Sequence, residues 1–506
     1  MSRPIRLMIF SGLICLGLAG ILSVVLSGPE GTGLVLNEDI PYYSLPWNDN
    51  PFYPGEITTS DGKLANWETA PSAEFCAQCH EKEYREWVVS IHAVTGPDII
   101  YETIIEANEH AHASRYGTEK IRWCDSCHEP LLTLMGGVNP LAVVGPNAAA
   151  AEGTSCVVCH TTVHAEPLAG NGALTLAINN INEYFDPALI MAAPAEHAEA
   201  MQSTTVNPLL GQADFCGACH TEIRPPAVNG EEPMHLQDTF DEWRRSEYAD
   251  RGIQCQDCHM NPNPAGYVAA LKQGEQPEEA VSHRFVGVNY LLTAADLPDN
   301  LIVFLRGGHP PGDIPLDEWR DSLQEQQRLI VALLQEAADL KVEASSAVSP
   351  GQELTLNVTI TNSGAGHDLP TGPRDQRHMW LEMQVTDALG SVVYHSGWFN
   401  NQTGELDPEA VVYIKLLYDQ SGERITEHIL FNAVRVEYSR QPITAGTSDT
   451  IPYTFTLSPD VQGPLTVNVT LWYRLVLQEL VTYQLGLDMI VPPVMMAQTN
   501  LQVQLQ

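Results

Sequence analysis

Five short stretches of the sequence repeat one pattern, in which two cysteines separated by two residues are followed at once by a histidine. The first stretch, CAQCH, covers residues 76–80, and the other four begin at Cys124, Cys156, Cys216 and Cys255. Two thiols at this spacing can add to the two vinyl groups of a porphyrin, and the adjacent imidazole can then bind its iron. Each stretch therefore predicts one covalently bound haem c.

Other cysteine chemistry explains the pattern less well. A redox-active pair needs a βαβ frame, and structural zinc pairs two such motifs at short spacing. Disulfide bonds suit an exported chain, but they give no reason for a histidine after every pair. The sequence therefore predicts five haems, held by ten of the eleven cysteines and by five proximal histidines. The cysteines are Cys76, Cys79, Cys124, Cys127, Cys156, Cys159, Cys216, Cys219, Cys255 and Cys258, and the histidines are His80, His128, His160, His220 and His259.

A second axial ligand, histidine or methionine, usually completes the iron of an electron-transfer haem. Apolar residues at helical spacing between positions 84 and 91 predict a helix that runs from the first motif to His92. Twelve helical residues rise about 18 Å, whereas two ligands on opposite sides of one iron are only ~4 Å apart. His92 is therefore predicted to bind a haem other than the one held by His80.

The other candidate distal ligands are single histidines between and after the motifs. His164 follows His160 by four residues, so on a helix both imidazoles would point the same way and serve different haems. His110 and His112 are two apart and would face different directions, which leaves the choice between them open. His367 lies in the turn sequence GAGHDLPTG, where it either reaches a haem or only occupies the turn. The full set of distal candidates is His92, His164, His283, His197, His112, His110, His235 and His367.

The first 29 residues have features of a membrane anchor or of a signal peptide. Arg3 and Arg6 precede an uncharged run over residues 7–29, which is long enough to span a bilayer. A cleaved signal peptide is the alternative, although VLSG at residues 25–28 is a poor cleavage site. In both cases the haem-binding part is predicted to lie outside the cytoplasm, periplasmic or extracellular, and a retained anchor is the favoured interpretation.

Acidic residues outnumber basic residues by 63 to 25, which gives a formal charge of −38. Such a chain would repel the phosphates of a nucleic acid, so nucleic-acid binding is not expected. The charge either steers basic redox partners or keeps the protein soluble. The predicted partners are electron donor and acceptor proteins, and membership of a larger respiratory complex or of a homo-oligomer is left open.

The rest of the chain divides by its hydrophobic pattern. After residues 1–29, an irregular lead segment is predicted for residues 30–75, a pentahaem domain for residues 76–312 and a connecting helix for residues 313–342. Residues 343–506 alternate apolar and polar positions in some seven segments, such as ELTLNVTITN, which favours an Ig-like β-sandwich. The predicted fold is a mostly helical, haem-packed multihaem cytochrome c domain followed by an all-β Ig-like sandwich that serves docking or assembly.

Several of these stretches resemble the multihaem c-type cytochromes, among them CAQCHEKEYREWVVSIHA, GTSCVVCHTTVH, TFDEWRRSEYADRGIQCQDCHM and SHRF. The resemblance, over roughly residues 72–290, is strongest to proteins that share a domain with the tetrahaem cytochrome that accepts electrons from hydroxylamine oxidoreductase. It implies stacked haem pairs, mainly bis-histidine ligation and His92 as a distal ligand. GAGHDLPTG with WLEMQVTDALGSVVYHSG is similar to a β-module of larger multihaem cytochromes. Because this chain has five motifs and not four, neither the haem order nor the partner can be carried over.

Three functions are consistent with the sequence. The prediction is an exported, membrane-anchored pentahaem cytochrome that relays electrons between redox partners. The first alternative is a multihaem oxidoreductase in which one haem keeps an open axial position for a small nitrogen or sulfur compound. Twelve histidines lie outside the motifs, so an open position is not required. The second alternative is a subunit of an extracellular cytochrome filament, which would need a cleaved N-terminus.

Overall fold

A computed structural model describes most of the chain after residue 50. Residues 50–506 form one compact unit, whereas residues 1–49, which include the predicted anchor, lie outside the described residues. Within the described ranges, none of the helices combines the length and apolar character needed to cross a bilayer. The described ranges are 51–53, 55–66, 70–105, 123–136, 152–180, 187–201, 207–226, 231–277, 280–294, 297–307, 314–344 and 348–506.

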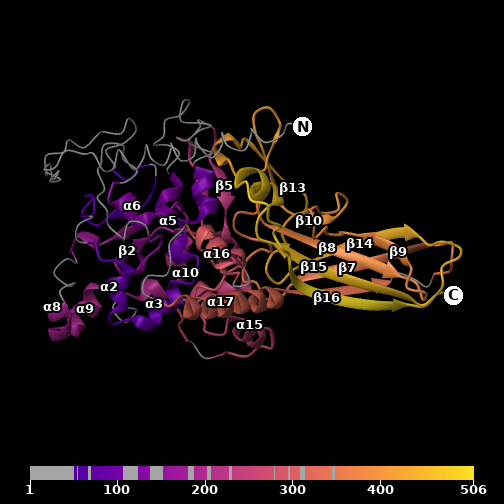
Figure 1. Ribbon diagram of the computed structural model, residues 1–506, viewed down its shortest axis with the longest axis horizontal. Helices are drawn as coiled ribbons and strands as arrows, with labels where there is room; N and C mark the ends of the chain where they lie inside the picture. The colour runs from indigo at the N-terminus through magenta and orange to yellow at the C-terminus, as the bar shows by residue number, and fades with distance from the viewer. Residues whose placement is uncertain are drawn as a thin grey trace, which may run out of the picture. The chain divides into compact units, whose positions relative to one another are not determined.

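Short helices carry the cysteine motifs, and most of them are joined by irregular chain (Figure 1). In the first and fourth motifs the histidine N–H donates to the carbonyl of the first cysteine, at 2.9 Å for both His80 and His220. One helical turn therefore brings each histidine next to its own cysteines. The motif helices are α2 (Ala73–Ala77), α5 (Asp125–His128), α7 (Cys156–His160), α10 (Ala213–Gly217) and α14 (Cys255–His259).

Further helices and small sheets surround these motifs. They include two sheets of short strands, one in the order β1-β3-β2 and the other formed by β4 and β5. The helices are α3 (Glu81–Trp87), α6 (Pro130–Leu134), α8 (Pro187–Ala192), α9 (Pro194–Ala200), α12 (Thr239–Arg244), α13 (Glu247–Asp250), α15 (Pro264–Lys272) and α16 (Asp299–Leu305), and the strands are β1 (Thr58–Thr59), β2 (Thr162–Ala165), β3 (Leu174–Leu176), β4 (Glu222–Arg224) and β5 (Met234–Gln237).

The helix after the first motif is shorter than the sequence predicts. Helix α3 ends at Trp87, and His92 begins a separate 3₁₀ turn, so the prediction of one continuous helix is wrong. The buried guanidinium of Arg306 donates to the carbonyls of Val88 (2.7 Å) and Ser90 (3.2 Å). Because this cation satisfies carbonyls that would otherwise continue the helical ladder, the chain can turn there.

The chain after the third motif also departs from the expected helix. Helix α7 ends at His160, and His164 lies on strand β2. The hydroxyls of Thr161 and Thr162 donate to carbonyls one turn earlier in α7, each at 2.7 Å. These bonds occupy the last helical carbonyls, and β-branched residues favour the strand that follows.

Helix α17 (Leu316–Glu336) joins the helical part to the strands and packs beside β16 (Figure 1). It begins after Pro315 with acidic residues in its first turn, and it buries Trp319, Leu323 and Leu334 on one face. The helix ends earlier than the predicted connecting helix, because residues from Ala338 onward alternate buried and exposed positions and form a strand.

Eleven named strands follow, and their ladders are all antiparallel. One sheet has the order β14-β7-β6, a second has β10-β8-β15-β16 with β9 paired to β8, and a third has β12-β11-β13. The strands are β6 (Ala338–Ala344), β7 (Glu353–Asn362), β8 (His378–Thr386), β9 (Val392–Ser396), β10 (Val411–Tyr413), β11 (Lys415–Tyr418), β12 (Arg424–Ile425), β13 (Arg435–Tyr438), β14 (Ser448–Thr456), β15 (Leu465–Arg474) and β16 (Val494–Val503).

The first two of these sheets share one hydrophobic core. Alternate residues of β7, such as Val358 and Ile360, pack in the same cluster as Met383 of β8 and Val469 of β15, and all four are fully buried. The predicted order, a helical part followed by a strand-rich part, is confirmed, while the Ig-like arrangement of the strands stays a prediction.

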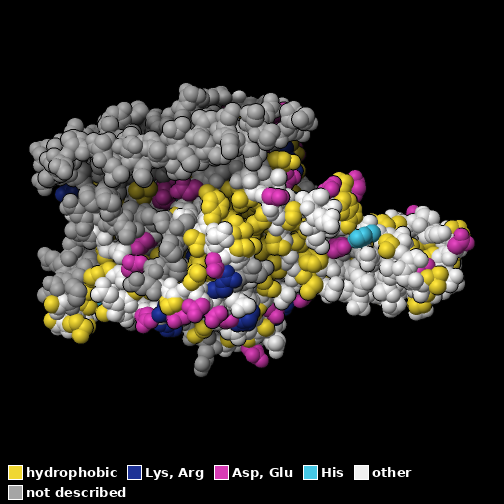
Figure 2. Space-filling view, viewed as in Figure 1, with side chains coloured by type: hydrophobic (Ala, Val, Ile, Leu, Met, Phe, Trp, Pro, Cys, Tyr) yellow, Lys and Arg dark blue, Asp and Glu magenta, His cyan; other side chains and the backbone are white. Residues whose placement is uncertain are grey.

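On the face drawn in Figure 2, white polar side chains and backbone cover most of the strand-rich part. Along β7 and β14 the hydroxyls of facing residues bond to each other, at 2.9 Å between Thr359 and Thr450 and at 3.0 Å between Thr355 and Thr454. Such cross-strand hydroxyl pairs stabilise a sheet whose outer face contacts water.

Buried polar contacts join the strand-rich part to the helical part. Lys415 of β11 donates to the carbonyl of Leu236 on β5 at 2.7 Å. Arg374, in the loop between β7 and β8, pairs with Glu242 of α12 at 3.2 Å. Both cationic side chains are almost fully buried, so these contacts hold the loop between β7 and β8 against the helices that carry the motifs.

Candidate haem sites

Cysteines of different motifs meet in pairs. The side chains of Cys76 and Cys156, of Cys127 and Cys219, and of Cys216 and Cys255 are close enough to interact, and Sγ of Cys127 lies 3.8 Å from the carbonyl oxygen of Cys219. The first motif therefore adjoins the third, the second adjoins the fourth, and the fourth adjoins the fifth. None of the ten motif cysteines is in a disulfide bond. Within the described residues, no cluster of three or more His, Cys, Asp or Glu side chains is arranged to hold a metal ion.

Three motif histidines each face one histidine from a distant part of the chain. Their ring centres are 6.4 Å apart for His220 and His92, 6.5 Å for His160 and His283, and 6.3 Å for His259 and His367. An iron–imidazole bond of about 2 Å on each side, with about 1 Å from each nitrogen to its ring centre, places two axial imidazoles about 6 Å apart. The spacing of all three pairs therefore fits a haem iron bound between the two rings.

In several of these rings, Nδ1 lies within hydrogen-bonding distance of a backbone carbonyl oxygen. Nδ1 of His259 contacts the carbonyl of Val286 (2.6 Å), and Nδ1 of His367 contacts that of Asp368 (2.9 Å). Nδ1 of His160 lies 3.2 Å from the carbonyl of Met201. A bond of this kind places the proton on Nδ1 and leaves Nε2 free to bind a metal.

The surroundings keep these imidazoles neutral. Burial and, to a smaller extent, the neighbouring His220 together lower the pKa of His92 to about 3. Burial likewise lowers the pKa of His283, His259 and His367. Neutral imidazole is the form that binds iron, so these sites favour the state that a ligand requires.

At the second motif, a tyrosine ring contacts the motif histidine, whereas the three motifs above have a facing histidine. The ring of Tyr101 stacks on His128 with centres 4.1 Å apart, and its hydroxyl donates to Asp125 of the same motif. Nδ1 of His128 contacts the carbonyl of Thr95 at 2.8 Å, and burial lowers the pKa of His128 to about 4. Tyr101 and Thr95 therefore fix the orientation of this imidazole.

The cavity at the second motif contains a histidine that sequence reasoning missed. His128 and both cysteines of its motif line this cavity together with His428, whose Nδ1 lies 2.6 Å from a carboxylate oxygen of Asp375. His428 has a left-handed backbone with φ of 57°, which is uncommon outside glycine. Nothing in the local sequence TEHILF indicates this placement, because it depends on the fold of the strand-rich part.

Of the remaining candidates, His164 and His235 do not face a motif histidine in the part of the chain that the structure describes. His164 and His235 are exposed, and each contacts a nearby carboxylate at 2.7 Å, Glu166 and Asp238 respectively. His197 lies on α9, close enough to His160 to contribute to lowering its pKa. His110 and His112 lie outside the described residues. The ligand roles of all these histidines stay predictions.

Comparisons with known proteins concern the motifs and the fold. The family described as cytochrome c554 and c-prime matches residues 75–163, which include the first three motifs. No curated protein sequence matches the chain. The fold is similar to the crystal structure of a penta-heme cytochrome c552 from Thermochromatium tepidum, with a TM-score of 0.52 and 17% identity over 86% of this chain and 99% of that one. Together the family match and the shared fold support a multihaem c-type cytochrome.

Proposed function

We propose that this protein is an exported pentahaem c-type cytochrome that relays electrons, with one haem covalently bound at each of the five motifs. The facing pairs His220 with His92, His160 with His283 and His259 with His367 are the observation that carries this proposal. Bound haem would supply the one-electron redox chemistry. The ten cysteines and five motif histidines hold the cofactors, and the facing histidines serve as distal ligands at three of them.

The contacts between motifs support a path for the electrons. Thiol contacts place the first motif beside the third, and the fourth beside both the second and the fifth. The third and fourth sites approach each other through their distal ligands, because Phe285 contacts both His92 and His283. The proposed path therefore runs from the first site through the third to the fourth, where it divides toward the second and the fifth.

The strand-rich part has a role in this proposal beyond docking. His367 belongs to the loop between β7 and β8, so residues 343–506 supply a ligand to a haem whose cysteines lie in residues 76–312. The Glu242–Arg374 pair holds that loop in place. Outside this unit, the arginines and the uncharged run of residues 1–29 support an N-terminal anchor that holds the protein at a membrane with its haems outside the cytoplasm. The net charge of −38 suits basic redox partners.

Low-temperature electron paramagnetic resonance of the oxidised protein tests the relay, with haem content measured by a pyridine haemochrome assay. Five haems are expected, and at least three should give low-spin bis-histidine signals. Alanine substitution of His92 or of His283 should convert one low-spin haem to high spin. A content below five haems, or variants whose spectra match the wild type, would overturn the proposal.

A second candidate function is catalysis at the haem of the second motif. Within the described residues, the ring of Tyr101 stacks on His128, and the cavity beside them is lined by His428, which pairs with Asp375. A small nitrogen or sulfur compound on an open iron could accept a hydrogen bond from His428. A stoichiometric high-spin signal that nitrite or hydroxylamine alters would favour this function, and five low-spin haems would exclude it.

A further inference from the structure

The short segment of residues 282–286 contacts ligands of three candidate haem sites. His283 faces His160, and the ring of Phe285 lies 4.5 Å from that of His92, centre to centre. Val286 exchanges two bonds with His259: its carbonyl accepts from Nδ1 at 2.6 Å, and its N–H donates to the histidine carbonyl at 2.8 Å. The segment, called the junction segment below, therefore connects the third, fourth and fifth sites.

Phe285 has an unusual backbone within the junction segment. Its φ is 45°, in the left-handed region that a bulky residue seldom adopts, because Cβ then crowds the neighbouring backbone. Such a conformation persists only where the surrounding structure over-determines it, and it is found preferentially at functional sites. Neighbouring contacts must therefore stabilise the conformation of Phe285, and the conformation indicates a functional role for this residue.

Contacts from three directions supply the support. Glu86 of α3 accepts hydrogen bonds from the hydroxyl of Ser282 (3.0 Å) and from the N–H of His283 (2.8 Å). Gln326 of α17 donates to the carbonyl of Arg284 at 2.8 Å. The N–H of Ser282 donates to the carbonyl of Met260, next to the fifth motif, at 2.6 Å. The backbone on both sides of Phe285 is thus held by separate elements.

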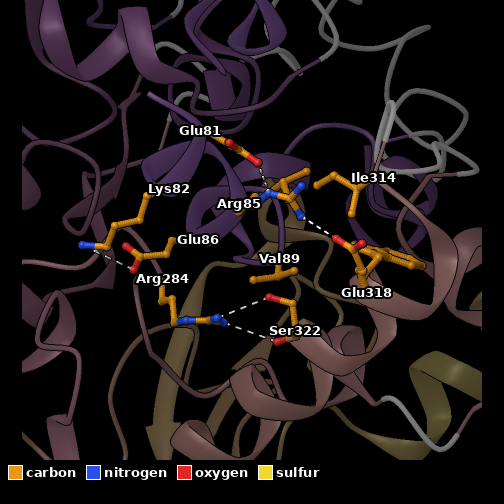
Figure 3. Close-up of a pocket in the computed structure, with 11 residues that line it drawn as sticks. Glu81, Lys82, Arg85, Glu86, Val89, Arg284, Ile314, Glu318 and Ser322 are labelled. Atoms are coloured by element: carbon orange, nitrogen blue, oxygen red, sulfur yellow. Dashed lines mark hydrogen bonds and ion pairs between the residues drawn. The ribbon is translucent and has the colours of Figure 1, made fainter. Parts of the chain in front are cut away.

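Figure 3 shows Glu86 and Arg284 among the residues that line a pocket of about 430 Å³. Glu86 reaches in from α3, and the guanidinium of Arg284 points to Ser322 of α17, with contacts of 3.3 Å to its hydroxyl and carbonyl. Arg85 bridges the same two helices by bonding to Glu81 and Glu318, at 2.8 and 2.9 Å. The junction segment is therefore held between two linked helices.

The ring of Phe285 stands nearly perpendicular to two imidazoles. Its plane makes an angle of 76° with His92, and an angle of 88° with His283, whose ring centre is 6.1 Å away. Edge-to-face contacts are a favoured arrangement of aromatic rings. Rotation of either imidazole about its bond to Cβ would lose this contact, so one phenyl ring restrains the planes of both.

We propose that Phe285 is a positioning residue for electron transfer between the haems of the third and fourth motifs, because it sets the imidazole planes of their distal ligands, His283 and His92. This inference rests on the proposed electron relay. With haem held at both sites, the step would be the transfer of one electron from a ferrous to a ferric haem, and His283 and His92 would be their distal ligands. No bond forms or breaks at Phe285, and no proton moves.

Three substitutions in the full-length, haem-loaded protein distinguish the loss of the aromatic ring at position 285 from a general effect of substitution on folding. Phe285→Leu removes the ring, Phe285→Tyr keeps it, and Phe304→Leu removes a half-exposed phenylalanine of α16 that contacts no candidate ligand in the described structure. Phe285→Met is a second ring-free variant that fills irregular space flexibly, in case leucine prevents folding. The measurements are electron paramagnetic resonance g values, potentiometric titration and the rate of electron exchange between haems.

In the ring-free variants we expect shifted g values for two of the low-spin haems and a several-fold slower electron exchange, with five low-spin haems still present. Phe285→Tyr and Phe304→Leu should match the wild type. Equal spectra and rates in Phe285→Leu and the wild type would overturn the inference, and so would a tyrosine variant that shifts as much as the leucine variant. Failure of the relay itself would appear separately, as a wild-type protein without bis-histidine signals from His92 and His283.

Discussion

The helical region and the strand-rich region bury their apolar side chains in different ways. Among the strands, a single continuous cluster runs through two sheets and includes fully buried residues such as Leu356, Met383 and Leu471. Among the helices, the buried residues fall into separate small clusters, for example around Leu176, around Val89 and around Tyr267. Between these clusters lie the cysteine motifs and their histidines.

This difference indicates what each part needs in order to fold. Alternating apolar residues are sufficient to specify two packed sheets, so most of the core of the strand-rich part comes from its own strands, and Tyr290, Leu291 and residues of α17 complete it. The helical part has short helices and little continuous apolar contact, and an extended apolar macrocycle at each motif would join its clusters. We therefore expect its folding to be coupled to haem attachment, as metal binding is coupled to folding in other small domains.

Withholding haem should produce the largest effect. When the full chain is made without the machinery that attaches haem, residues 73–307 should lose the protection of their amides against hydrogen exchange, because their separate clusters lack the groups that join them. Strands β7, β8 and β15 should keep theirs. Hydrogen exchange followed by mass spectrometry checks this expectation for both regions in the same sample.

The haem-loaded protein, in which both parts should be protected, is the control. If both parts lose protection together when haem is absent, the strand-rich part depends on the helical part, and the comparison fails.

The next largest effect should come from His367, the residue through which the strand-rich part reaches a haem site. His367→Ala should convert one low-spin haem to high spin, because the ring facing His259 at 6.3 Å is removed. Electron paramagnetic resonance checks the change, and added imidazole should restore the low-spin signal.

His395→Ala is the matched control, because His395 lies on β9 and bonds to Glu382 at 2.9 Å. Its spectrum should equal that of the wild type. An unchanged spectrum in His367→Ala would show that the strand-rich part supplies no ligand.

The features that the sequence could predict are those that depend on residue type and local spacing. The five motifs, the strand-rich character after residue 343 and most of helix α17 follow from such patterns. The end of α3 could not be predicted, because Arg306 lies far away in the sequence. The same holds for the strand at His164, for His428 in the cavity of the second motif and for the left-handed backbone of Phe285. Each of these depends on contacts that exist only after the chain has folded.

A smaller effect is expected from a cavity in the core of the strand-rich part. Leu356 of β7 is fully buried, and Leu356→Ala should destabilise this part by about 3 kcal/mol through lost burial and an unfilled cavity. Hydrogen exchange of β7 in increasing urea measures the change, while the haem spectra should stay as in the wild type.

The neighbouring Thr355→Ala removes an exposed hydroxyl and should cost less than about 1 kcal/mol. Altered haem spectra in Leu356→Ala would show that the two parts unfold as one unit, contrary to the comparison.

The smallest effect concerns the pH dependence of the contact between the parts. Burial raises the pKa of Glu242 from 4.5 to about 7, although the neighbouring Arg374 lowers it. The folded state therefore keeps this proton at pH values where the unfolded state has lost it, so the contribution of Glu242 to stability falls as the pH rises from about 4.5 to about 7. Glu242→Gln should remove this contribution and flatten the decline in stability by about 3 kcal/mol.

Urea denaturation at several pH values measures this slope. Because Glu242→Gln also removes the ion pair with Arg374 at every pH, the slope and not the absolute stability is the quantity to compare. Glu382→Gln is the control, because the carboxylate of Glu382 pairs with His395 within the strand-rich part. This variant should show the same decline in stability between pH 4.5 and about pH 7 as the wild type. An equal slope in Glu242→Gln and the wild type would show that this buried carboxyl does not link pH to the attachment of the loop that carries His367.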